Sequence, residues 1–165
     1  MSVQVILDIL QKQSEVYEQL LELANQKTPV LVNNDVQQLN AILQQERKLV
    51  KRSEELEFSR MQHTNIFFAN MRSHYRLGKL SDLIKAVTNA DDKVALSRYH
   101  RILVDLLDEL KRKNDQNQQL IEQSLSFLDF SIQLLTDDPS DEYTYKHPQS
   151  LAYGKSQGYG LDIKR

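Results

Sequence analysis

Gly78 is the only glycine or proline between Pro29 and Pro139, so the middle of the chain contains almost no residue that favours a turn. Gly and Pro together make up only about 4% of the chain, against roughly 12% in an average protein. Sandwiches, barrels and doubly wound sheets need turns at short, regular intervals, and this chain cannot supply them. Long helices with few connections remain, and the length of 165 residues indicates one folded unit.

Three long segments repeat apolar residues every three or four positions, which is typical of helices: residues 3–33, 36–76 and 92–136. Short connections between long helices make the neighbours antiparallel. The sequence therefore predicts an all-α fold, an elongated antiparallel bundle of three long helices plus a short helix, within a domain of residues 1–136. The periodicity then stops, and residues 137–165 are predicted to form a flexible, disordered polar tail.

Local signals predict where these helices begin and end. Pro29 predicts a kink or break near Lys27-Thr28, because proline removes a backbone donor from a helix interior. The polar run at 33–35 predicts a stop and a new start, with Asp35 as the N-cap of the second long helix. Ser81 is the predicted cap of the short helix.

The chain has no cysteine, which excludes a disulfide framework, thiolate catalysis and cysteine-ligated metals. Its first residues lack the basic start and the long apolar run of a signal peptide. No window approaches 18 consecutive apolar residues, so no membrane-spanning segment is predicted. These features predict a soluble cytoplasmic protein that does not insert into a membrane.

The small net charge of −2 conceals a basic excess in residues 36–80. This excess includes Arg47, Lys48, Lys51 and Arg52. A nucleic-acid-binding protein usually has a larger, one-sided excess. Packing beside the more acidic first and third segments is sufficient to neutralise these residues, so nucleic acid is not a predicted partner.

No combination of residues indicates a metal site, a cofactor or a catalytic centre. None of the four histidines is preceded by Glu three residues earlier, the spacing found in di-iron helical bundles. The stretch Gly154-Lys155-Ser156-Gln157-Gly158 matches the letters of a nucleophile elbow, but no strand pattern precedes it and no His follows it. The sequence therefore predicts that the protein is not an enzyme and needs no cofactor.

The segment from Leu120 to Leu135 has an apolar surface much wider than that of an ordinary amphipathic helix. At 100° per residue this surface covers about 220°, against roughly 100° for a usual apolar stripe. It consists of two rows. The first apolar row contains Leu120, Phe127, Phe130 and Leu134, and the second apolar row contains Ile121, Leu125, Leu128, Ile132 and Leu135. One row can pack inside the monomer, and the other then needs a different partner.

Two explanations of the second apolar row are open at this point. The row packs against the kinked end of the first helix or in a homodimer, and a permanent homodimer would make the protein a structural coiled-coil or adaptor protein. Alternatively, the row is a seat for an amphipathic helix of another protein, and its residues are then client-binding residues.

Several short helical patterns occur together over most of residues 3–136. In chain order they are Leu20-Leu21-Glu22-Leu23-Ala24 with Lys27, Asp35-x-x-x-Leu39, Glu46-x-x-Leu49, Leu56-Glu57-x-x-Arg60, and Asn114-x-x-Asn117-x-x-Leu120-Ile121-x-x-Ser124-Leu125-x-Phe127. With this order, spacing, chain length and a polar tail that contains Tyr, the sequence resembles the FlgN-type flagellar export chaperones.

The resemblance implies an all-helical cytoplasmic chaperone without ATPase activity. Its clients would be two flagellar hook-filament junction proteins, bound through their C-terminal helical segments and delivered to the cytoplasmic domain of the type III export gate. The family binds clients through its C-terminal portion, which agrees with the second apolar row. In some members an aromatic residue near the C-terminus docks on the export gate. Tyr143 and Tyr145 are candidates by location, and the alternative is that they are ordinary tail residues.

Overall fold

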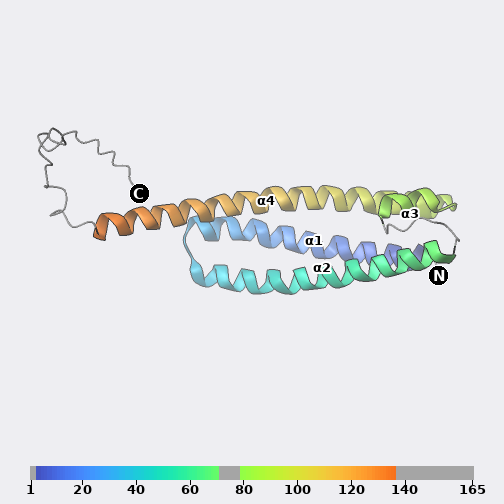
Figure 1. Ribbon diagram of the computed structural model, residues 1–165, viewed down its shortest axis with the longest axis horizontal. Helices are drawn as coiled ribbons and strands as arrows, with labels where there is room; N and C mark the ends of the chain where they lie inside the picture. Colours follow the sequence, from blue (N-terminus) through green and yellow to red (C-terminus); the bar gives the residue numbers. More distant parts are fainter. Residues whose placement is uncertain (1–2, 71–78, 137–165) are drawn as a thin grey trace, which may run out of the picture. The chain divides into compact units, whose positions relative to one another are not determined.

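The computed structural model describes residues 3–70 and 79–136, and nearly all of these residues are helical (Figure 1). The helices are α1 (Val3–Val32), α2 (Val36–Asn70), α3 (Leu80–Ala86) and α4 (Ala90–Thr136). The predicted all-α fold with three long helices and one short helix is confirmed. Residues 71–76 of the predicted second segment and the predicted tail from residue 137 lie outside the described residues, so that tail and its boundary remain predictions.

The chain divides into two compact units, one that ends at Leu125 and one that begins at Ser126. In the first unit, α1 and α2 run antiparallel and α4 lies along α1 in the same direction as α1 (Figure 1). α1 is the central helix, because it supplies more than half of the buried apolar side chains among the described residues. The buried apolar side chains of α4 are Leu96 and Leu103.

Three apolar clusters along α1 hold the first unit together. The largest joins all four helices and contains Val3, Ile6, Leu7, Leu10, Phe68, Leu83, Val87, Leu96 and Leu103. The next joins α1 to α2 through Ile9, Val16, Leu20 and Leu56, and the last does so through Leu23, Val30 and Ile42. Because full burial of one such side chain contributes about 1.5–3 kcal/mol, these clusters are the main source of stability.

A tight turn ends α1 and starts α2 where the sequence predicted it. Asn34 has a φ of 53°, in the left-handed region that asparagine tolerates. The N–H of Asp35 donates to the carbonyl of Val30 at 3.1 Å and that of Asn34 donates to Leu31 at 3.2 Å, a Schellman motif. Asp35 Oδ1 accepts a hydrogen bond from the N–H of Gln38 at 3.0 Å, which confirms Asp35 as the N-cap.

Of the kink or break predicted near Lys27-Thr28, the break is wrong, because α1 continues through Pro29 to Val32. Pro29 lies in the last turn of α1, where it has no N–H to donate to the carbonyl of Asn25. The two residues that follow it, Val30 and Leu31, are buried. Their burial holds this last turn in place and offsets the cost of the proline.

The predicted cap of the short helix is also wrong. α3 begins at Leu80, with Lys79 as its N-cap, and Ser81 is inside the helix. Lys79 has an extended backbone, and its side chain makes no capping hydrogen bond. Its carbonyl accepts the first hydrogen bonds of the helix, from the N–H groups of Asp82 and Leu83. Burial of Leu83 and Val87 in the largest apolar cluster fixes α3 in position.

Polar contacts join α1 to α4 about one and two turns before the end of α1. Asn117 is only 2% exposed. Its Nδ2 donates to the carbonyl of Ala24 at 2.8 Å, and its Oδ1 accepts from Thr28 Oγ1 at 2.7 Å. A buried amide that is bonded on both sides allows only one register between two helices. Asn117 therefore fixes how the following turns of α4 meet the end of α1.

Asn117→Ala is expected to lower the free energy of unfolding by about 1–3 kcal/mol, because it leaves the Thr28 hydroxyl and the Ala24 carbonyl without this partner. The measurement is urea unfolding followed by far-UV circular dichroism. Asn114→Ala, on an exposed position of the same helix, is the matched control and should change stability by no more than about 0.5 kcal/mol. Equal effects of the two substitutions would contradict the register contact.

Two further polar contacts join α1 to α2. Lys27 Nζ lies 2.7 Å from both carboxylate oxygens of Glu46. Closer to the start of α1, Gln13 Nε2 donates to Glu57 Oε2 on α2 at 3.0 Å. Arg60 Nε, also on α2, donates to the same oxygen at 2.8 Å. The hydrogen bonds from Arg60 lower the pKa of Glu57 against the opposing effect of burial, and Gln13 lowers it further.

Candidate functional site

The second apolar row lies exposed on α4. The exposed fractions are 39% for Ile121, 56% for Leu125, 54% for Leu128, 57% for Ile132 and 86% for Leu135. Isolated apolar residues on a surface are common, but a contiguous row of large aliphatic side chains marks an interaction site. The row therefore has the exposure that its predicted client-binding role requires, and the role itself remains a prediction.

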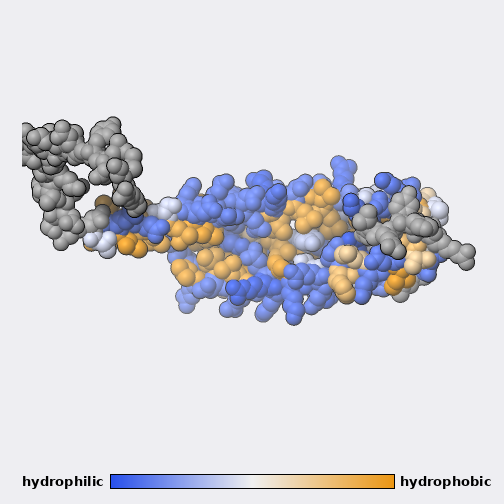
Figure 2. Space-filling view, in the orientation of Figure 1, coloured by the Kyte–Doolittle hydropathy of each residue, from blue (hydrophilic) through white to orange (hydrophobic). Residues whose placement is uncertain are grey.

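The first two residues of this row also line a pocket, which we call the turn pocket. Its walls come from the end of α1, the tight turn, the start of α2 and one side of α4: Val30, Leu31, Asn34, Asp35, Val36, Leu39, Ile121, Ser124 and Leu125. Its volume is about 210 Å³, enough for one large apolar side chain. In Figure 2 apolar surface gathers at this end of the first unit. The end of α1 thus covers Ile121 and Leu125 only in part.

The first apolar row, which could have packed inside the monomer, is largely exposed as well. In the first apolar row Phe127, Phe130 and Leu134 are 68%, 56% and 64% exposed. Only Leu120 is half-buried. Both rows of residues 126–136 therefore expose apolar side chains.

Sequence reasoning thus missed two parts of the site. The exposed aromatic residues of the first apolar row were not among the predicted client-binding residues, although the unusual width of the apolar arc already indicated more surface than one neighbour can bury. The α1 and α2 walls of the turn pocket were not anticipated at all. The short polar run at 33–35 was the signal for them, since a tight turn places the end of one helix beside the start of the next.

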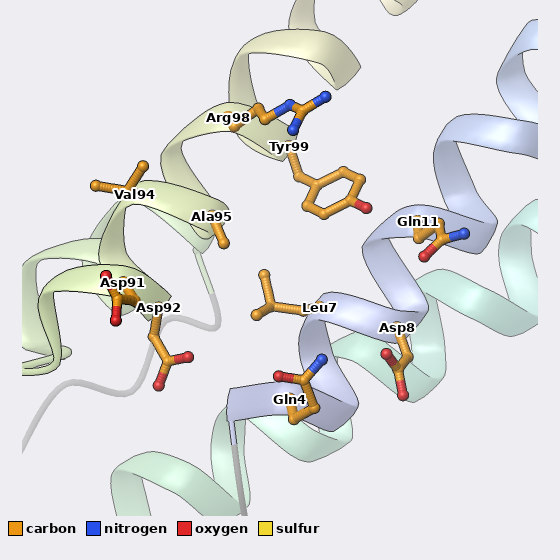
Figure 3. Close-up of a pocket in the computed structure, with 10 residues that line it drawn as sticks. All are labelled: Gln4, Leu7, Asp8, Gln11, Asp91, Asp92, Val94, Ala95, Arg98 and Tyr99. Carbon is orange, nitrogen blue, oxygen red and sulfur yellow. The ribbon is translucent and has the colours of Figure 1, made fainter.

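A second cavity, of about 540 Å³, lies between the start of α1 and the start of α4 (Figure 3). Its lining is mostly polar and includes three carboxylates, those of Asp8, Asp91 and Asp92. Figure 3 shows Asp8 on the opposite side of Leu7 from the other two, so the carboxylates do not converge. Within residues 3–70 and 79–136, no group of His, Cys, Asp or Glu is arranged to hold a metal ion.

Two other observations concern the predicted partners. No helix in the described part of the chain is long and apolar enough to cross a membrane. Tyr143 and Tyr145, the predicted export-gate residues, lie outside the described residues.

Comparison with known proteins places the chain in a family. The model of the FlgN protein family matches residues 1–152. The chain belongs to the FlgN family. It is also 27% identical over 135 residues to the uncharacterized protein YvyG of Bacillus subtilis strain 168, an alignment that covers 82% of this chain and 81% of YvyG. No solved structure matches the chain.

Membership confirms the resemblance that the helical patterns suggested. The FlgN family indicates a flagellar export chaperone, a protein that binds other proteins. A chaperone of this family recognises other flagellar proteins, so its functional surface is a surface that binds a polypeptide. Among the described residues, the exposed end of α4 and the turn pocket best fit that requirement.

Proposed function

We propose that this protein is a cytoplasmic chaperone that binds the C-terminal helical segments of flagellar hook-filament junction proteins. It keeps them unassembled and delivers them to the cytoplasmic domain of the flagellar type III export gate. Membership of the FlgN family supports the chaperone role. The observation that carries the proposed binding mode is the exposed second apolar row on α4, whose spacing suits an amphipathic client helix.

The energetic reason for binding is the removal of apolar surface from water. Complete burial of one aliphatic side chain contributes about 1.5–3 kcal/mol, so covering the five exposed residues of the second apolar row contributes several kcal/mol in total. This gain must exceed the freedom lost when two molecules associate. A client helix laid on α4 would hide its own apolar face as well, and that face could then not take part in assembly.

The turn pocket gives the proposed complex an anchor point. A large apolar side chain of the client would enter it and contact Leu31, Val36 and Leu39 on one side and Ile121 and Leu125 on the other. Buried anchors of this kind dominate the affinity of many interfaces. Part of the client's affinity thus depends on the α1–α2 turn as well as on α4.

Delivery is the second part of the proposal. Tyr143 and Tyr145 dock the loaded chaperone on the export gate, because a tyrosine buries a rigid ring with one polar end and few torsions to fix. Their position after the client-binding segment allows both contacts at the same time.

Co-purification with each junction protein, followed by measurement of the complex mass in solution, tests the proposal. A free monomer that forms a one-to-one complex with a junction protein is the expected result. A dimer that persists at all concentrations and binds neither junction protein would instead identify a structural coiled-coil or adaptor protein.

A further inference from the structure

An open depression on α2 has no role in the proposed function. Its volume is about 620 Å³, and its walls are residues of α2 alone: Leu43, Glu46, Arg47, Val50, Lys51 and Glu54. It shares no residue with the turn pocket or with the second apolar row. We call this depression the α2 surface.

The apolar part of the α2 surface follows one line along the helix. Leu43 and Val50 are seven residues apart, which is about two helical turns, so their side chains point in the same direction. Ile42 packs against α1, whereas Val50 is 42% exposed. Phe58 and Met61, both exposed, continue apolar surface on the same side of α2. The α2 surface can therefore bury apolar side chains of a partner.

The charged part of the α2 surface has an uncompensated basic pair. Arg47 and Lys51 lie one helical turn apart beside the apolar line, and both are exposed. Neither side chain makes an ion pair or a hydrogen bond with any residue that the structure describes. Glu46 is already bound by Lys27, so Glu54 is the one acid of this surface that could oppose the two bases. The α2 surface is thus locally basic although the whole chain has a net charge of −2.

We propose that the α2 surface binds an acidic amphipathic helix of another protein. Two carboxylates one turn apart on that helix would lie opposite Arg47 and Lys51, because residues at i and i+4 share a helix face. The apolar face of the same helix would cover Leu43 and Val50. Opposite charges of this kind act mainly on partner choice and on the rate of association. The inference goes beyond the proposed function, which places the client on α4 and in the turn pocket.

Two other occupants match the α2 surface less well. A second copy of this chain has exposed acids in one line on α1, namely Asp8, Glu15 and Glu22, but the neighbouring Gln11 is polar too. That line would therefore meet the bases without covering the apolar line. An anionic membrane would press negative charge against Glu54 as well as against the bases. A helix can place a neutral residue opposite Glu54, and a continuous anionic surface cannot.

The test uses two fluorescently labelled synthetic peptides of about three heptads with the same seam of Leu and Ile. One peptide carries Glu at the positions that flank the seam, and the other carries Gln. Fluorescence anisotropy at low ionic strength should show that the full chain binds the Glu peptide roughly fivefold more tightly than the Gln peptide. The negative net charge of the chain opposes this preference, so a local basic surface is needed to produce it. Added salt should reduce the preference, because salt screens exposed charges.

Charge changes on α2 locate the preference. Arg47→Glu with Lys51→Glu should reverse it, so that the Gln peptide binds more tightly, and helical content should stay the same because both positions are exposed. Glu54→Gln should raise the affinity for the Glu peptide about twofold, because it removes the opposing charge. Lys48→Glu with Lys111→Glu makes the same change in net charge at exposed positions outside the α2 surface. This control should preserve the preference for the Glu peptide.

Leu128→Asp separates the inference from the proposed function, because Leu128 belongs to the second apolar row. The preference for the Glu peptide should persist in this variant, and a junction protein should still bind the variant with Arg47→Glu and Lys51→Glu. If Leu128→Asp abolishes binding of the Glu peptide and the α2 variant does not, the peptide binds on α4 and the inference is wrong.

Other outcomes would also overturn the inference. Equal affinity for the two peptides would remove the evidence for charge selection, and loss of the preference in the Lys48 and Lys111 control would assign it to net charge. Self-association that Arg47→Glu with Lys51→Glu abolishes would identify a second copy of the chain as the occupant. Binding to phosphatidylserine vesicles but to neither peptide would identify a membrane surface instead.

Discussion

Leu128→Asp is expected to abolish binding of a junction-protein helix and to leave the helical content of the free chaperone unchanged. Leu128 is 54% exposed, so a carboxylate at this position remains hydrated in the free protein. In the complex the same carboxylate would be buried without a partner. That burial costs several kcal/mol, which corresponds to a loss of affinity of roughly a hundredfold or more.

Ile121→Asp should act in the same way, with an additional effect on the turn pocket, because Ile121 is less exposed than Leu128 and lines that pocket. Val94→Asp is the matched control, since Val94 is an exposed apolar residue near the start of the same helix. Binding is measured by titration with a client segment, and helical content by circular dichroism. Loss of helicity in the free Leu128→Asp protein would show that the row belongs to an internal core.

The helices themselves were predictable because their signals are local. The three-four spacing of apolar residues and the absence of turn formers predict three long helices wherever the chain folds. The capping oxygen of Asp35 acts only three residues along the chain, and its role was read correctly. Pro29 was misread because the burial of Val30 and Leu31, which holds the last turn of α1, is a tertiary effect.

The site was predictable only in part, for a related reason. The width of the apolar arc on α4 indicated an unpartnered row, but helical periodicity cannot say how much of either row a neighbouring helix covers. For Ile121 and Leu125 the partial cover comes from the end of α1, which lies beside them at the turn pocket. Phe127 and Phe130 are exposed although their helical spacing alone is equally compatible with a buried row.

The residues that carried the family resemblance have a physical explanation in the fold. Lys27 and Glu46 belong to two separate patterns, and the structure pairs them. Asn117, from the last pattern, donates to the carbonyl of Ala24 in the first. These patterns therefore contain polar contacts that hold helices in register, as well as apolar residues that any helical bundle would need. Contacts between residues so far apart in the chain could not be read from helical spacing.

The contact between Lys27 and Glu46 leads to the largest expected effect on stability. The two side chains are 9% and 18% exposed and join α1 to α2. Glu46→Leu leaves the Lys27 ammonium buried without its partner, and this should lower the free energy of unfolding by about 3 kcal/mol. Lys27→Met combined with Glu46→Leu removes both charges, and its stability should return to within about 1 kcal/mol of the original protein, because apolar residues of similar volume replace a buried ion pair without penalty.

The ion pair of Arg52 and Glu55 on α2 provides the control for these two variants, since its side chains are 55% and 53% exposed. Glu55→Leu makes the same chemical change on the same helix and should cost no more than about 1 kcal/mol, because water already screens that pair. All four proteins are compared by urea unfolding under identical conditions. If Glu46→Leu and Glu55→Leu cost the same, or if adding Lys27→Met to Glu46→Leu restores nothing, then burial of the Lys27 charge is not what makes Glu46 necessary.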